Sequence, residues 1–311
     1  MPGFLTHYLF GIETSDSLSE NYIQHVIREN NHAFLLGIQG SDLLSFNPHA
    51  LSRRGLSYRT AAQSLQNQEY AAFFNHMLDC IEGMESKDKD ICAAYMAGYL
   101  CYYTIDLFAA PYIIYRVWQD LPPGCRMSRM NAHKADIETV IDIVLLRSHC
   151  HMEPSQLNIN ALTFAGKHEI SIISHILYDT IQRTYKYTIS KKEISTGIRQ
   201  IRRSSIYLRP DSRYRRLWCD LFVRSGPASA ISRKKVYEDF QPDNEDFMNR
   251  EKHPWYPYAG CPQAQHSSFD ELYTGALLAA RTLLESFDSC VSWGMDREDF
   301  INSIIRMTPY L

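Results

Sequence analysis

Apolar residues recur every three or four positions along most of the chain, which is the spacing of one buried helix face. In the stretch 64–84, for example, the apolar positions include Phe73, Met77 and Ile81. Alternating patterns that would predict β-strands are scarce. Helices are predicted over the following stretches: 21–27, 64–84, 91–107, 136–146, 169–184, 267–287 and 297–307. We therefore expect an all-α fold, built as a multi-helix bundle.

The stretch 91–107 is apolar on nearly all sides, which predicts a buried central helix. Its uncharged part covers 15 residues from Ile91 to Ile105 and is closed by Asp106. A helix that spans a bilayer needs about 20 apolar residues, so this stretch is too short to cross a membrane. The opening residues also lack the basic region of a secretory signal. We expect a cytoplasmic protein.

Proline and glycine interrupt the helical pattern at several places. Pro122, Pro123 and Gly124 predict a turn not far beyond the central helix. The stretch 225–262 contains five prolines and two glycines, so it is expected to be a long irregular loop that wraps the helices. No internal repeat is present, and we expect one helical domain over 1–311.

Composition and charge narrow the class of protein. The chain of 311 residues is 45% hydrophobic and 22% charged, which excludes a disordered chain. None of the eight cysteines forms a CxxC pair, so a zinc–thiolate site has no support. The stretch 183–235 holds 15 Lys and Arg against three acidic residues. This basic stretch is either a solvated face or a surface for anionic lipid. No nucleic-acid-binding motif is present, and no nucleic acid is expected as a partner.

Five groups of fragments follow one another along the chain. They are THY at 6–8, LGIQGSD at 36–42, AYMAGYLCYYTID at 94–106 with APYI at 110–113, HKADIE at 133–138 with Asp142, and DFMNREKHPW at 246–255 with SFDELY at 268–273. In this order and spacing the set resembles the zinc-dependent phospholipase C family, in its intracellular bacterial branch. The resemblance covers nearly the whole chain, from residue 2 to about residue 285.

The resemblance implies an all-α bundle with a cleft in which zinc ions assist hydrolysis of phospholipid phosphodiesters. Zinc takes about four ligands, mostly imidazole and carboxylate in such sites. The metal polarises a phosphoryl oxygen and lowers the pKa of a bound water. The residues at the matching ligand positions are His7, Asp42, Asp106 and Glu138, with His133 out of register beside the last of them.

Several imidazoles that the resemblance calls for are missing. Gln66, Tyr102 and Ala110 stand where the family has histidine, and Lys134 takes the strict match to a fourth. A phenol with an ordinary pKa near 10 is a poor zinc ligand. We therefore expect no zinc cluster, and Asp106, at the end of a buried helix, is expected to pair with Tyr102, His7 or a cation.

Three functional hypotheses remain open. The first is a metal-depleted relative that binds a small organic or phospholipid-headgroup ligand in an aromatic cleft. In this case the cleft would be lined by Gln66, Tyr102, Tyr103, Tyr112 and Tyr115. A new metal-free activity would then use Asp106 or Glu138 as general acid or base and Tyr102 as a donor.

The second hypothesis is a phosphodiester hydrolase with a reduced, single-zinc site. At least three ligands would have to converge, drawn from this set: His7, Asp42, Asp106, His133 and Glu138. The third hypothesis is a non-enzymatic interaction protein that uses the basic surface of 183–235.

Overall fold

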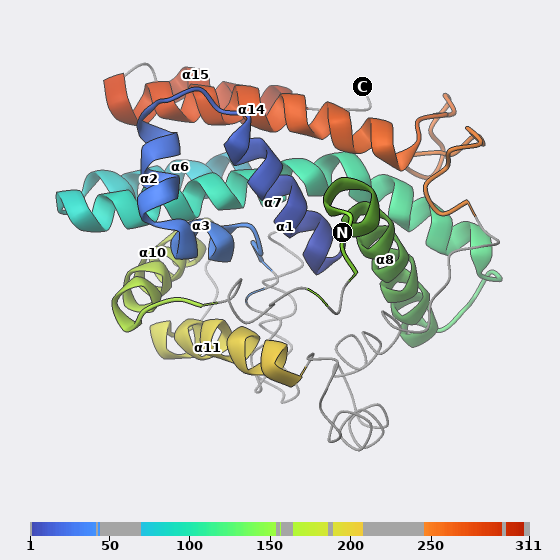
Figure 1. Cartoon of the computed structure of the whole chain (residues 1–311), viewed down its shortest axis with the longest axis horizontal. Coiled ribbons are helices and arrows are strands. Elements are labelled where there is room, and N and C mark those ends of the chain that lie inside the picture. Colours follow the sequence, from blue (N-terminus) through green and yellow to red (C-terminus); the bar gives the residue numbers. More distant parts are fainter. Residues whose placement is uncertain are drawn as a thin grey trace.

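The computed structural model describes residues 2–41, 43, 70–153, 156, 164–185, 189–207, 246–293 and 297–307. These residues form ten α-helices and no β-strand, which confirms the all-α prediction (Figure 1). The helices are α1 (Phe4–Asp16), α2 (Tyr22–Glu29), α3 (Asn31–Gly37), α6 (Tyr70–Glu82), α7 (Ser86–Asp120), α8 (Met127–Cys150), α10 (Lys167–Tyr185), α11 (Lys191–Tyr207), α14 (Phe269–Trp293) and α15 (Arg297–Arg306).

Helix α7 is the core of the bundle, as the apolar stretch 91–107 predicts. It packs against helices that include α1, α3, α8 and α14, and side chains from Ile91 to Asp106 are all buried. Figure 1 shows α14 running along one side of α7, with α10 and α11 below. The most apolar 18 residues of α7 have a mean hydropathy of 1.2, which is enough for a membrane span, but 89% of them are buried inside the protein.

Helix α7 is longer than the sequence pattern predicts, because it continues through Pro111 to Asp120. Proline removes one backbone hydrogen bond from a helix and crowds the preceding turn. Tertiary contacts hold the second half of α7 in place: Tyr112 donates to the carbonyl of Phe247 (2.8 Å), and Arg116 donates to the carbonyl of Asp246 (2.8 Å).

Helices α3 and α7 cross at a pair of glycines. A Cβ atom added to Gly37 would lie 2.1 Å from the carbonyl oxygen of Tyr95, and one added to Gly98 would lie 2.2 Å from that of Phe34. Only glycine leaves room for two backbones this close. The crossing fixes the turn that follows α3 against the middle of α7, where Gly40 lies against Tyr102.

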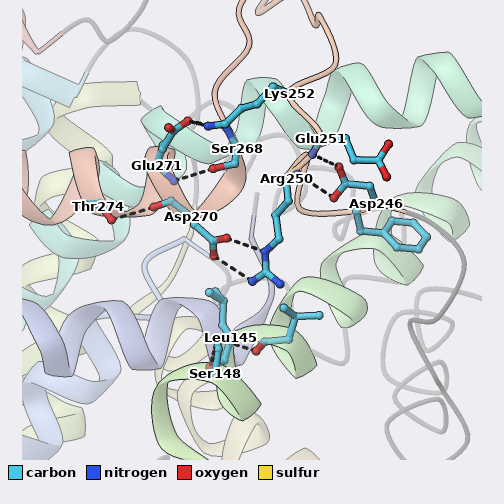
Figure 2. A network of polar contacts seen from close by, with 12 residues as sticks. Leu145, Ser148, Asp246, Arg250, Glu251, Lys252, Ser268, Asp270, Glu271 and Thr274 are labelled. Carbon is cyan, nitrogen blue, oxygen red and sulfur yellow. Dashed lines mark hydrogen bonds and ion pairs between the residues drawn. The ribbon is translucent and has the colours of Figure 1, made fainter.

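The described part of the predicted irregular stretch, 246–262, has no helix and is tied to both α7 and α14. Figure 2 shows Arg250 paired with Asp270 and Lys252 paired with Glu271. The reciprocal hydrogen bonds between Ser268 and Glu271 form a capping box at the start of α14. The remainder of that stretch, 225–245, lies outside the described residues.

Helix α11 is not among the expected helices. Its Ile194 and Ile198, one turn apart, are both buried, so an apolar stripe exists within the basic stretch 183–235. The expected membrane surface of that stretch falls mostly on residues 208–235, which lie outside the described residues.

Candidate functional site

His7, Tyr102 and Asp106 form a buried cluster between α1 and α7. The Nε2 atom of His7 lies 3.3 Å from Oδ1 of Asp106, and both side chains are nine-tenths buried or more. This contact confirms that Asp106 pairs with His7, one of the partners expected for it. Tyr102 stands one turn before Asp106 on α7, so both side chains project from the same face of the helix.

The second ring nitrogen of His7 determines what lies between the ring and Asp106. Nδ1 is 2.9 Å from the carbonyl oxygen of Gly3, which can only accept, so Nδ1 carries a proton. Nε2 therefore faces Asp106 either as a lone pair or as the second N–H of an imidazolium. Two acceptors at 3.3 Å would repel each other. A proton or a cation must lie between His7 and Asp106.

Tyr102 occupies space beside this pair. Its ring stacks on the imidazole of His7, with centroids 4.8 Å apart and planes inclined by 21°. Its hydroxyl is 2.8 Å from Oγ of Ser41. On the other side lies Gly40, which has a φ of 47° and whose added Cβ would lie 2.1 Å from the Tyr102 ring. The phenol thus fills the position where the resemblance calls for a metal-binding imidazole.

A second buried carboxylate, Asp142, lies at the start of α1. It accepts hydrogen bonds from the backbone N–H groups of Leu5 (3.1 Å) and Thr6 (2.8 Å), and from the hydroxyl of Thr6 (2.7 Å). A carboxylate is stabilised there by the free N–H groups and the dipole of the helix. Asp142 thereby ties α8 to the helix that carries His7.

The other expected site residues lie elsewhere or outside the described chain. His133 is 2.8 Å from Asp120, and Glu138 pairs with Lys134 at 3.5 Å, both on partly exposed faces. These two contacts involve neither His7 nor Asp106. Tyr103 packs on Tyr70 and Phe74. Asp42 and Gln66 lie outside the described residues.

The residues that the structure describes do not fit a zinc cluster. Within this part of the chain, no group of three or more His, Cys, Asp or Glu side chains has the geometry to hold a metal ion. His7 and Asp106 supply two donors, whereas a zinc site needs three or four protein ligands. Their separation of 3.3 Å is close to that of two ligands on one tetrahedral zinc at about 2.0–2.1 Å from each. A single ion would need a further ligand from beyond the described residues.

A surface cavity of about 270 Å³ lies where the second half of α7 meets the loop 246–255. Its wall combines aromatic, basic and acidic side chains with the side-chain amides of Gln119 and Asn249. The lining residues are Tyr112, Tyr115, Arg116, Gln119, Asp120, Asp246, Asn249, Glu251, His253, Pro254 and Trp255. Two of the predicted aromatic lining residues, Tyr112 and Tyr115, are therefore in one cavity. Tyr102 and Tyr103 belong to the core.

Neither a protein-family model nor a curated protein nor a solved structure matches this chain. The chemistry of the cavity and the central cluster therefore carries the functional argument.

Arg116 is the basic centre of the cavity. Its guanidinium donates to the Asp246 carbonyl, lies 5.4 Å from the ring of Phe247 and is 3.8 Å from the carboxylate of Asp120. Its buried Nε has no hydrogen-bond acceptor among the described residues. Beside it, burial raises the pKa of Tyr112 to about 12, against a smaller opposing effect of Arg116. Tyr112 therefore remains a neutral donor at physiological pH.

The loop side of the cavity is rigidly built. Asp246 accepts from the backbone N–H groups of Arg250 (2.9 Å) and Glu251 (2.8 Å), as Figure 2 shows. Asn249 is buried and donates to the carbonyls of His253 and Ser267. Both oxygens of Asp246 are used by the loop itself. Asp120 pairs with His133 through Oδ2, and Glu251 pairs with His253 through Oε2. The second oxygens of Asp120 and Glu251 are therefore the carboxylate acceptors left to meet a ligand.

Sequence reasoning named Asp142 beside the fragment 133–138 but gave it no role, and it gave none to Arg116. A signal for Asp142 was present, since it is the one charged residue inside the apolar run 140–146. For Arg116 the sequence carries no comparable signal. Its role depends on a loop that is about 130 residues away along the chain.

Proposed function

We propose that this protein is a metal-depleted relative of the zinc-dependent phospholipase C family, which binds a small zwitterionic phospholipid headgroup without hydrolysing it. The ligand class is a phosphate ester of choline or ethanolamine. The observation that carries the proposal is the mixed cavity beside α7, whose wall includes Arg116, the carboxylates of Asp120 and Glu251, and aromatic side chains. The central cluster, where Tyr102 replaces an imidazole, supports the loss of metal chemistry.

The chemistry of the cavity matches the two ends of such a headgroup. The guanidinium of Arg116 is planar and presents several donors, which suits the oxygens of a phosphate. The cationic end suits a pocket in which Tyr115 and Trp255 accompany carboxylates, because ammonium groups bind over aromatic faces. A volume of about 270 Å³ admits a molecule of this size but not a whole lipid.

Calorimetric titration of the purified protein tests this function. The ligands are phosphocholine, phosphoethanolamine, choline and inorganic phosphate, each titrated separately. We expect the two zwitterions to bind at least about tenfold more tightly than choline or phosphate alone, because both ends of the cavity are then used. Equal affinity for phosphate and phosphocholine, or no binding of either zwitterion, contradicts the proposal.

A variant pair ties the binding to the cavity. Arg116→Gln removes the charge and is expected to lower the affinity for phosphocholine by at least about tenfold. The matched control is Arg147→Gln, at an exposed arginine that pairs with Glu153 away from the cavity. Thermal unfolding of both variants shows whether a loss of binding reflects a loss of fold.

A second candidate function is a phosphodiester hydrolase with one metal ion. It is favoured by the His7–Asp106 contact, since a cation between Nε2 and the carboxylate would remove the repulsion of two acceptors. In such a protein Nδ1, held by Gly3, would orient the ring, as second partners of metal-bound histidines do. The ion would supply a nucleophilic hydroxide and polarise the phosphoryl group.

Assay of a chromogenic phosphodiester with and without added zinc separates the two functions. The first proposal expects no zinc-dependent turnover. Turnover that requires zinc and disappears in Asp106→Asn supports the hydrolase instead.

A further inference from the structure

Large apolar side chains are exposed together where α7 ends. On α7, Ile114 is 38% exposed and Trp118, one turn later, is 52% exposed on the same face. Tyr115 lies beside them and connects this face to the loop 246–262. Its ring centroid is 6.2 Å from that of Tyr256, which is 43% exposed, and its hydroxyl donates to the carbonyl of Pro254. Exposed aromatic and aliphatic side chains are thus gathered at this end of α7, and such a gathering marks an interaction site.

The turn that follows carries positive charge and a further exposed apolar side chain. Between Asp120 and Asp136 the chain has no acidic residue. Arg126 and Arg129 are exposed and make no ion pair with any described residue, and Met127 between them is 69% exposed. We call Ile114, Trp118, Arg126, Met127 and Arg129 the α7–α8 tip.

The placement of these arginines is unfavourable for the helix. Met127 begins α8, whose first turn contains no acidic residue and whose N-cap, Arg126, makes no capping hydrogen bond. The N-terminus of a helix is its positive end, so cations there are disfavoured. The positive charge at the α7–α8 tip therefore does not serve helix stability. An anionic partner would remove this cost.

We propose that the α7–α8 tip docks on the surface of an anionic phospholipid bilayer. Trp118, Ile114 and Met127 would lie at the level of the headgroups, where tryptophan and other amphipathic or flexible apolar side chains are favoured. Arg126 and Arg129 would face the anionic lipids.

Charge favours a lipid surface over the other partners that could cover this face. In a symmetric contact with a second copy the same face meets itself, and the turn between Asp120 and Asp136 offers no acidic residue to pair with Arg126 and Arg129. A nucleic acid would leave Met127 and Ile114 without an apolar environment.

The docking surface adjoins the proposed ligand cavity. Tyr115 lies beside Ile114 and Trp118 and also lines the cavity. Docking of the α7–α8 tip would thus bring the cavity next to lipid headgroups. The docking itself needs no ligand in the cavity, so a failure of ligand binding would leave the docking proposal unaffected.

Vesicle flotation with the full-length protein tests the docking. The vesicles contain phosphatidylcholine alone or phosphatidylcholine with phosphatidylglycerol, at about 50 mM and about 500 mM salt. We expect binding to the anionic vesicles only, and a loss of at least fivefold at high salt. Absence of binding to anionic vesicles at low salt overturns the proposal.

Two double variants locate the surface. Arg126→Glu with Arg129→Glu is expected to lower the partition coefficient by about 25-fold or more, at about fivefold for each basic residue. Trp118→Ser with Met127→Ser is expected to lower it by on the order of tenfold. Matched controls are Arg28→Glu with Lys167→Glu, and Leu278→Ser with Ile305→Ser, at exposed positions on other helices.

Each variant is checked for fold by thermal unfolding and for mass by light scattering. If anionic vesicles bind both α7–α8 tip variants as well as the unchanged protein, another surface, such as the basic stretch 183–235, is responsible and the proposal is wrong. If Trp118→Ser with Met127→Ser converts a dimer to a monomer and leaves vesicle binding unchanged, the face is an interface between copies instead.

Discussion

Nε2 of His7 lies 3.3 Å from Oδ1 of Asp106, while the opposite ring nitrogen of His7 donates its proton to the carbonyl of Gly3. In a metal-free protein this contact needs one shared proton. An amide at position 106 would supply that proton from its own NH₂ group and satisfy Nε2 directly.

The first prediction concerns substitution of this carboxylate. We expect Asp106→Asn to lower the free energy of unfolding by only about 1 kcal/mol, because one neutral hydrogen bond replaces a charge-assisted one. Asp106→Ala should cost about 3 kcal/mol, because Nε2 then loses its partner in a buried site. Urea denaturation of both variants measures the difference. Equal, large losses for Asn and Ala would show that the carboxylate charge itself is needed, as in a metal site.

The second prediction concerns the carboxylate that caps α1. Asp142→Ala removes the acceptor of three hydrogen bonds from Leu5 and Thr6. We expect a loss of about 3 kcal/mol in the free energy of unfolding, since buried donors are left unpaired. The control is Asp16→Ala, at the exposed last residue of the same helix, which should be neutral or slightly stabilising. An equal effect of both substitutions would contradict this role of Asp142.

The third prediction concerns the crossing of α3 and α7. In Gly98→Ala the new methyl group would meet the backbone of Phe34 at 2.2 Å, so the helices must move apart. We expect a loss of at least about 2 kcal/mol in the free energy of unfolding, typical of overpacking against backbone. Gly83→Ala is the matched control, because its Cβ would meet nothing closer than 3.7 Å. Chemical denaturation should show a much larger loss in the free energy of unfolding for Gly98→Ala than for Gly83→Ala. Equal losses would contradict this account of the crossing.

The fourth prediction is a pH dependence at the start of α14. Hydrogen bonding to Lys252, with help from Ser268, lowers the pKa of Glu271 below its usual value of 4.5. A lowered pKa in the folded state means that the carboxylate stabilises the protein above pH 4.5 and loses this effect as the pH falls through the folded-state pKa.

Glu271→Gln tests this dependence. The variant should melt at a lower temperature than the unchanged protein at about pH 7, and the difference should shrink as the pH falls below 4.5 and through the lowered folded-state pKa. A melting difference that is the same at both pH values would show that the charge of Glu271 does not contribute.

Most of the helices could be read from the sequence because their apolar residues recur at helical spacing, although α11 was not among those expected. The stretch 91–107 could be read because it is apolar on nearly all sides, and its residues from Ile91 to Asp106 are buried as expected. The end of α7 could not be read in this way. Pro111 is unfavourable in a helix taken alone, and the contacts from Tyr112 and Arg116 to the loop compensate for it.

The central pair could also be predicted, because a carboxylate that closes the buried apolar stretch of α7 requires a partner and His7 was among the few available. The cavity could not. Arg116 meets the carbonyl of Asp246, and shares a cavity wall with Glu251, only after the chain has returned from a distant segment, and no local pattern records such a contact. His133 was expected near the carboxylates, but its neighbour is Asp120 on the cavity side of α7.

Elemental analysis of the purified full-length protein tests the central claim most directly. The protein is isolated without chelators, incubated with excess zinc and freed of unbound metal before measurement. The account predicts well below one zinc ion per chain, and no difference between the unchanged protein and Asp106→Asn. One or more zinc ions per chain, lost on substitution of Asp106, would contradict it.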